Sequence, residues 1–572
     1  MLKQTLNEIY TAILEEKTPT INVSQDMDKL GKRIPNGQLV IFLSISDNKS
    51  PAYVIKGEGK VFSDAIMAAL KTYINKKPSK FKPTSVKLDL LSEISPIKSS
   101  GPEFDLKNDK LSIDRGLDGL AFGEDMSTLF LPGEVTSNRL IRKDKVNLKN
   151  TFKVLNNQIP STFSKFTKPI DEDTSVDTFK FRTKSYFVNK DSYYELFRGH
   201  RVFSDLSKND LWEAVELTKD HYFKNVVNKK GKFFYSYLPQ DNKMEKRYNI
   251  LRHAGTIYSM LETYELMPDK ELLKEAERAF SFLFAQIKPF EINGRTVKVV
   301  VEKDAQKIGG NALAIVALAK YTNVTGNQKY LPLMQDLAAW LEEVQGDDGE
   351  FTVHKQKYST GEKFDFISHY YPGEAILALA RLHQIDKDEK WLDIAEKAAN
   401  FLINIRDKDD TISTIAHDHW LLYGLNDLYR ERSKDMYLDH SFFIAKAMMR
   451  TQIDEASATR SELIGGYVPK SGNDPSSTPV ACRSEGLSAA YRLANDYGHE
   501  DIAKQMKHAI QQGIKYQLQM QLRPESVMYY KRKNLCLGAV QGGLKNLSLR
   551  NDFTQHNISS FIACYNMLND SK

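Results

Sequence analysis

The stretch from His369 to Leu402, HYYPGEAILALARLHQIDKDEKWLDIAEKAANFL, reads as one helical hairpin. Its first helix begins at Pro372, because the fixed φ and missing N–H of proline suit the first helical position, and it continues to Leu382 with almost no polar face. After the turn IDKDEK, the second helix has apolar residues on one stripe and charged residues on the other. The first helix must therefore be buried on nearly all sides, and the second has one buried face and one face in solvent.

This pairing of an apolar with an amphipathic helix recurs through the C-terminal two-thirds of the chain. The apolar helices are expected at 252–264, 311–321, 372–382, 419–429, 482–494 and 555–568. Their amphipathic partners are expected at 272–284, 330–341, 391–402, 436–449, 502–518 and, for the last pair, 210–226. Two concentric rings of helices require this pattern, so the sequence predicts an all-α (α/α)6 toroid. An open solenoid is the alternative, but the ragged spacing, with insertions at 346–367 and 451–479, favours the closed ring.

The composition is that of an ordinary globular protein. Hydrophobic residues make up 41% and charged residues 27% of 572 residues, and the net charge of +6 comes from scattered basic residues, which gives a nucleic-acid partner no support. The three cysteines cannot all pair and are expected to be buried thiols in a reducing compartment. We find no signal peptide and no run of membrane-spanning length, so we expect a cytoplasmic chain. The sequence has no GxGxxG after a strand, no Walker A motif and no HExxH, and we expect no cofactor. Its oligomeric state stays open.

The N-terminal part has a different sequence pattern, with alternating residues typical of strands, short helices and Gly/Asp turns. We therefore expect a small α+β domain at residues 1–155, a polar connector at 156–205 and the toroid at 206–572. The whole chain is then multidomain, with the α+β domain preceding the toroid.

Both parts resemble known families. In the N-terminal part, VKLDLL (86–91), DRGLDGLAF (114–122) and LFLPGEV (129–135) resemble the AMMECR family, although its Arg-Gly-Cys-Ile-Gly signature is missing between Leu39 and Ala65. The helical part resembles the six-hairpin glycosidase-like superfamily, which contains glycoside hydrolases, polysaccharide lyases and sugar epimerases. This resemblance implies a carbohydrate or another polar small molecule as the substrate.

In a toroid the inner helices are parallel, so their first turns gather at one end, which we call the mouth. Polar and aromatic residues recur there. Helix capping is the alternative explanation, with Thr478 and Thr554 as the expected N-caps, but it does not account for the accompanying His, Arg, Trp and Tyr residues. The predicted substrate-binding residues are Arg252, Tyr370, Tyr371, Trp420, Arg483 and Asn557, and helix-start residues His253 and Asn311 are expected around the same cavity.

The predicted catalytic residues are Glu374, Asp418, His419, Glu485 and His556. In a hydrolase, Glu485 would be the general acid and Asp418 or Glu374 the base that activates water. In an epimerase, His419 and His556 or a tyrosine would move the proton. The alternative from another class is a non-catalytic scaffold that holds a glycan or peptide.

A metal site at His417 and His419, completed by His556 or Cys482, was weighed as well. Toroids of the lanthionine synthetase type bind zinc through Cys and His. Their Cys-His-Gly signature is absent here, so the sequence analysis expects no metal.

Overall fold

The computed structural model describes residues 2–17, 28–34, 37–77, 80–99, 104–123, 128–156, 177–468 and 474–569. The chain divides into two compact units. Unit 1 comprises Met1–Phe203, Leu238–Lys243 and Leu522–Leu537, and unit 2 comprises Ser204–Tyr237, Met244–Gln521 and Gly538–Lys572. Each unit is therefore built from segments that are distant in sequence. No helix in the described ranges is long and apolar enough to span a membrane.

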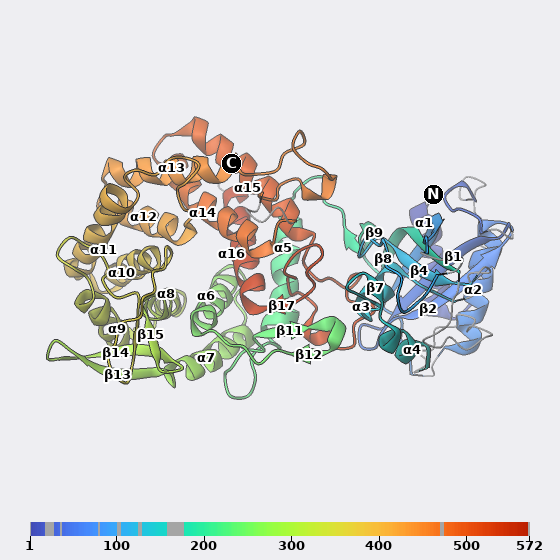
Figure 1. Cartoon of the computed structure of the whole chain (residues 1–572), viewed down its shortest axis with the longest axis horizontal. Helices are drawn as coiled ribbons and strands as arrows, with labels where there is room; N and C mark the ends of the chain where they lie inside the picture. Colours follow the sequence, from blue (N-terminus) through green and yellow to red (C-terminus); the bar gives the residue numbers. More distant parts are fainter. Residues whose placement is uncertain are drawn as a thin grey trace. The chain divides into compact units, whose positions relative to one another are not determined.

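Unit 2 is a closed double ring of helices (Figure 1). Each inner helix contacts the next around the ring, and the last contacts the first. In chain order the inner helices are α6 (Ile250–Leu266), α8 (Ile308–Thr325), α10 (Tyr371–Asp386), α12 (His419–Glu431), α14 (Ser477–Asp496) and α16 (Asn551–Asn569). The outer helices that pack on them are α7 (Lys270–Phe284), α9 (Leu331–Glu343), α11 (Glu389–Phe401), α13 (Asp435–Arg450), α15 (Glu500–Leu518) and, on α16, α5 (Lys208–Leu217). The predicted toroid is confirmed, and the ring closure excludes the open solenoid.

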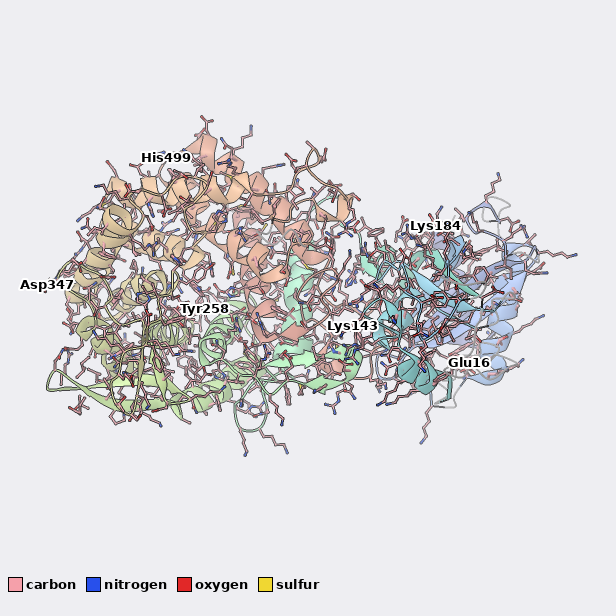
Figure 2. All side chains as sticks on the ribbon, viewed as in Figure 1. Glu16, Lys143, Lys184, Tyr258, Asp347 and His499 are labelled. Carbon is pink, nitrogen blue, oxygen red and sulfur yellow. The ribbon has the colours of Figure 1, made fainter. Side chains whose placement is uncertain are left out.

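Burial follows the sequence pattern of the two kinds of helix. In α8 every residue from Ile308 to Ala319 is buried, as its lack of a polar face requires. Tyr258 of the inner helix α6, labelled in Figure 2, lies inside unit 2, and the Arg381 guanidinium of α10 lies 5.2 Å above its ring. The exposed residues Asp347 and His499, labelled in the same figure, lie at the periphery of unit 2. Polar side chains also lie farther along some inner helices, where the Thr256 hydroxyl of α6 contacts Gln555 of α16 and Arg381 of α10 donates to Asp427 of α12.

The segment between α7 and α8 contributes three strands, and the segment between α9 and α10 a fourth, to a small antiparallel sheet that the helical pattern does not predict. Its order is β13 (Ile287–Ile292), β14 (Arg295–Glu302), β15 (Ala305–Lys307) and β16 (Lys355–Lys357). Asn293 and Gly294 form the first turn with φ values of 52° and 78°, the left-handed pair typical of a tight hairpin.

Unit 1 is built on an antiparallel sheet with the order β10-β9-β8-β3-β1-β2, in which β4 pairs with β8 and β5 with β4. The strands are β1 (Leu39–Ser46), β2 (Tyr53–Gly59), β3 (Ser85–Pro96), β4 (Gly119–Phe122), β5 (Thr128–Phe130), β8 (Thr178–Asn189), β9 (Tyr193–Phe197) and β10 (His200–Arg201). A two-stranded sheet of β6 (Ile141–Arg142) and β7 (Lys145–Val146) and the helices α3 (Pro132–Ser137) and α4 (Leu148–Asn156) complete the unit, while α1 (Leu2–Glu15) and α2 (Phe62–Lys76) share one apolar cluster with the sheet.

The chain from Thr178 to Arg201 belongs to this sheet, although the sequence analysis places it in the connector at 156–205. The reason is β8, which pairs with β3 along its whole length and buries Phe181 and Phe187. Residues 157–176 of the predicted connector lie outside the described residues.

The segment Leu522–Leu537 covers part of the second face of the unit 1 sheet. Met528 and Tyr529 join its apolar cluster, and the Met528 carbonyl accepts a hydrogen bond from the Ala52 amide at 2.7 Å. The Tyr529 hydroxyl is hydrogen-bonded to Ser44 Oγ at 2.8 Å and lies 3.4 Å from Lys87 Nζ. Unit 1 thus takes part of its core from the C-terminal region of the chain.

We predict that Tyr529→Ala destabilises unit 1 by about 3–5 kcal/mol, because it removes a buried aromatic ring and takes the phenol away from Ser44 and Lys87, of which Lys87 keeps Asp89. Hydrogen exchange measured by mass spectrometry should speed up at the amides of β1 and β3. Tyr497→Ala, which truncates a tyrosine that is 42% exposed on unit 2, is the control and should change neither strand. Unchanged exchange in β1 and β3 of Tyr529→Ala would contradict the role given to this segment.

Candidate active site

Neighbouring inner helices approach one another closely at glycines, in the first turns of α8 and α10 and in the third turn of α14, and the side chains around these contacts line the mouth. A Cβ on Gly309 of α8 would lie 2.2 Å from Glu374 Oε2 of α10, and one on Gly373 of α10 would lie 2.6 Å from the Leu421 amide nitrogen of α12. A Cβ on Gly486 of α14 would lie 3.1 Å from Cα of His419. Only glycine fits such spacings, so the polar residues of different helices are brought within reach of each other.

Glu374 lies in the first turn of α10 and is 5% exposed. Its Oε2 has no hydrogen-bond partner among the residues that the structure describes. Burial, followed by the nearby Asp418 carboxyl, raises the pKa of Glu374 well above its usual value. The group is therefore a buried carboxyl that holds its proton more tightly than an ordinary glutamate does.

Asp418 is the N-cap of α12, and its Oδ1 accepts hydrogen bonds from the amides of Trp420 at 3.0 Å and Leu421 at 3.1 Å. Its Oδ2 is buried and unpaired within the described ranges. Burial raises the pKa of the carboxyl to about 7, although the capping hydrogen bonds and Arg406 act in the opposite direction. One oxygen thus begins the helix while the other is left for a ligand.

His419, Cys482, Glu485 and His556 form a second group, contributed by α12, α14 and α16. One donor atom from each lies within 4.8 Å of the donor atoms of the others. His556 Nδ1 lies 2.8 Å from Glu485 Oε2, and the His419 and His556 rings are 5.3 Å apart, edge to face. These are the side chains of the mouth that could hold a metal ion.

The two histidines of this group have different surroundings. Burial, with His556 and Arg483 nearby, lowers the pKa of His419 well below its usual value, and neither of its ring nitrogens has a hydrogen-bond partner in the described chain. Burial by itself would also lower the pKa of His556, but Cys482 and Glu485 raise it well above the usual value. Burial raises the pKa of the Cys482 thiol.

Arg252 and Arg483, the two predicted arginines, are held in place by side chains of unit 2. Arg252 Nε pairs with Asp552 Oδ2 at 2.9 Å, and its guanidinium donates to the Tyr235 hydroxyl. Arg483 Nε donates to His417 Nδ1 at 2.9 Å. Both guanidinium groups are therefore fixed in position before any substrate binds.

The remaining predicted binding residues differ in exposure. Tyr370 is 48% exposed, whereas Tyr371 and Trp420 are buried, Tyr371 beside Phe366 and Trp420 beside His419. Asn557 is fully buried, and its Oδ1 has no partner among the described residues. Tyr370 is thus the exposed aromatic face of this set.

Four expectations about the helix starts are wrong, among them Thr554 as an N-cap, because α16 already begins at Asn551 and the Thr554 hydroxyl accepts from the Val540 amide. His253 and Asn311 turn toward the outer layer, where His253 Nε2 bonds the Ala279 carbonyl of α7 and Asn311 Nδ2 bonds the Leu337 carbonyl of α9. Thr478 does not cap α14, because the helix already begins at Ser477 and Pro479 is tolerated within its first turn. Cys482 is the residue absent from the predicted site set, although its i, i+3 spacing to Glu485 places the two on one helix face.

The chain was compared with known proteins. No family model matches it, and no curated protein matches it. It is similar to the solved structures of an alpha-1,6-mannanase from Salegentibacter sp. HEL1_6 (13% identity, 62% of this chain and 98% of that chain, TM-score 0.45) and of cellobiose 2-epimerase from Bacillus thermoamylovorans B4167 (13% identity, 63% and 99%, TM-score 0.48). The likeness is one of fold, and the residues of the mouth carry the functional argument.

The buried Glu374 leads to a prediction about stability and pH. Its pKa in the folded protein is raised above the ordinary value of 4.5, so the folded state binds this proton more tightly than the unfolded state. Its contribution to stability is complete below that ordinary value and is lost as the pH rises through the folded pKa. Thermal unfolding should therefore show Glu374→Gln gaining stability over the unmodified protein as the pH rises. A difference that is constant with pH would contradict this.

Proposed function

We propose that unit 2 is an enzyme that binds a carbohydrate at the mouth and acts on it by proton transfer. The observation that carries the proposal is a concentration of buried hydrogen-bonding atoms without partners in the described chain: Glu374 Oε2, Asp418 Oδ2, both ring nitrogens of His419 and Asn557 Oδ1. An unpaired buried polar group costs about 1–3 kcal/mol. Such a cluster is expected where a ligand supplies the missing partners.

A carbohydrate is the ligand class that fits these groups best. Each sugar hydroxyl donates and accepts a hydrogen bond, so a polyol can satisfy carboxylate and amide oxygens and imidazole nitrogens at once. The fixed guanidinium groups of Arg252 and Arg483 supply donors at the rim. The half-exposed ring of Tyr370 offers an apolar face for a pyranose ring.

Glu374 and Asp418 are the proposed acid and base. The raised pKa of Glu374 favours its protonated form, which can donate to a departing glycosidic oxygen as a general acid does. Asp418 Oδ2 is an unpaired acceptor for a proton of water, while Oδ1 fixes the carboxylate to the helix start. Glycosidic hydrolysis is the reaction that two such carboxyl groups support.

This assignment changes the roles expected from the sequence. Glu485 is hydrogen-bonded to His556 and lies in one group with His419 and Cys482. It is not part of the carboxyl pair, so Glu374 rather than Glu485 is the proposed acid. An epimerase, in which His419 and His556 move the proton, differs from the hydrolase in its product. A scaffold protein differs from both, because it binds without turnover.

We also propose that unit 1 is an accessory domain of the AMMECR type. The stretches that carry the resemblance, 86–91, 114–122 and 129–135, include parts of β3, β4 and β5. Strand β8 pairs with both β3 and β4, and β4 pairs with β5. These distant motifs therefore meet in one sheet.

The proposal is tested by screening the full chain against a panel of α- and β-linked oligosaccharides, with the products identified by NMR. Glu374→Gln and Asp418→Asn should each lower turnover by about 10²–10⁴-fold, the usual effect of losing a general acid or base. Both changes keep the shape of the side chain, and the amide oxygen of Asn still caps a helix. Substrate binding should therefore survive.

Two adjacent glycines supply a matched control. Gly309→Ala places a methyl group 2.2 Å from Glu374 Oε2 and should lower turnover, whereas Gly310→Ala meets Val300 at 3.5 Å and Leu251 at 3.9 Å, which are ordinary contacts, and should not. Full activity in Glu374→Gln and Asp418→Asn would remove both assignments. Epimerised but uncleaved products would favour the histidine version, and binding without turnover would favour the scaffold.

A further inference from the structure

The side chains of His419, Cys482, Glu485 and His556 come from three successive inner helices of the ring. Cys482 and Glu485 stand i, i+3 on α14, and α14 contacts both α12, which carries His419, and α16, which carries His556. Their donor atoms lie within 4.8 Å of one another. A tetrahedral zinc ion with the usual bond lengths separates its ligand atoms by roughly 3.4–3.8 Å, so small side-chain rotations are enough to close the set around an ion.

The four donors are of the types that zinc prefers. A thiolate, two imidazoles and a carboxylate form a mixed sulfur, nitrogen and oxygen set, which selects Zn²⁺ over Mg²⁺ or Ca²⁺. The two negative charges of the Cys482 thiolate and the Glu485 carboxylate would neutralise a divalent cation. This balance matters because the site is buried, with Glu485 2% exposed and His556 9% exposed. Cys482 is half-buried, whereas the other three members of the group are buried.

His419 provides an observation independent of the cluster. Its side chain is 5% exposed, and neither ring nitrogen has a hydrogen-bond partner in the part of the chain that the structure describes. His556 is hydrogen-bonded to both Cys482 and Glu485. A proton relay through these three side chains would still leave His419 without a hydrogen-bond partner in the described chain. A metal ion at the centre of the four donors gives one of its nitrogens a partner.

We propose that His419, Cys482, Glu485 and His556 bind a divalent transition-metal ion of the zinc class. The site goes beyond the proposed function and does not depend on it, because Glu374 and Asp418 are not among its ligands. Binding exchanges the proton shared by His556 and Glu485 and the proton of the Cys482 thiol for the metal ion. The ion would add a Lewis acid to the mouth.

Cobalt spectroscopy tests this on the full chain without any substrate. The purified protein is stripped with a chelator and titrated with Co²⁺, which reports tetrahedral geometry through its visible bands and a thiolate ligand through a near-ultraviolet charge-transfer band. One equivalent should bind with both features, and Zn²⁺ should abolish them. Cys482→Ser should remove the charge-transfer band, and His419→Gln should weaken binding at least about tenfold.

Cys564→Ser is the matched control, because this buried thiol on α16 lies outside the cluster and its variant should keep both bands. Circular dichroism checks that each variant is folded, and Glu485→Gln replaces Cys482→Ser if the latter is not. Absence of the tetrahedral bands, or bands that survive unchanged in Cys482→Ser and His419→Gln, would overturn the proposal. So would alkylation of Cys482 by iodoacetamide at an unchanged rate in saturating Zn²⁺.

Discussion

The contact between α16 and α6 closes the inner ring, and the rest of unit 2 depends on it. These helices are separated by most of the domain in sequence, so closure buries the flanks of every inner helix at once. An all-apolar helix such as α8, which is buried from Ile308 to Ala319, is stable only in that setting. The glycines at positions 309, 373 and 486 let neighbouring inner helices approach closely beside the polar residues of the mouth.

Closure also explains why the mouth is rich in unsatisfied groups. The first amides of a helix need acceptors, and Asp418 supplies one with a single carboxylate oxygen. The second oxygen, the Glu374 carboxyl and the His419 ring are held in position by the packing of the ring. Sites that bind ligands commonly carry such strain at a cost in stability. The carboxyl pair and the Cys, His and Glu group therefore divide the mouth into two chemically different parts.

The ring could be predicted from the sequence, because helical periodicity is a local signal that repeats, and with it the grouping of His419, Glu485 and His556. The orientation of single side chains could not. His253 follows Arg252 by one residue, about 100° around the helix, and so bonds α7 while Arg252 reaches Asp552. The assembly of Cys482 with His419 required the contact of α14 with α12. In unit 1, β8 pairs with the distant strand β3, and Tyr529 is buried against strands of the N-terminal part. These segments are far apart in the sequence, so no local pattern predicts that they meet.

The central claim is that a carbohydrate binds at the first turns of the inner helices. Hydrogen exchange of the catalytically silenced Glu374→Gln chain, with and without a saturating oligosaccharide from the screen, tests it most directly. The account predicts slower exchange in peptides covering 250–257, 371–378, 419–426 and 551–558. Protection confined to unit 1 or to the outer helices, with these four stretches unchanged, would contradict it.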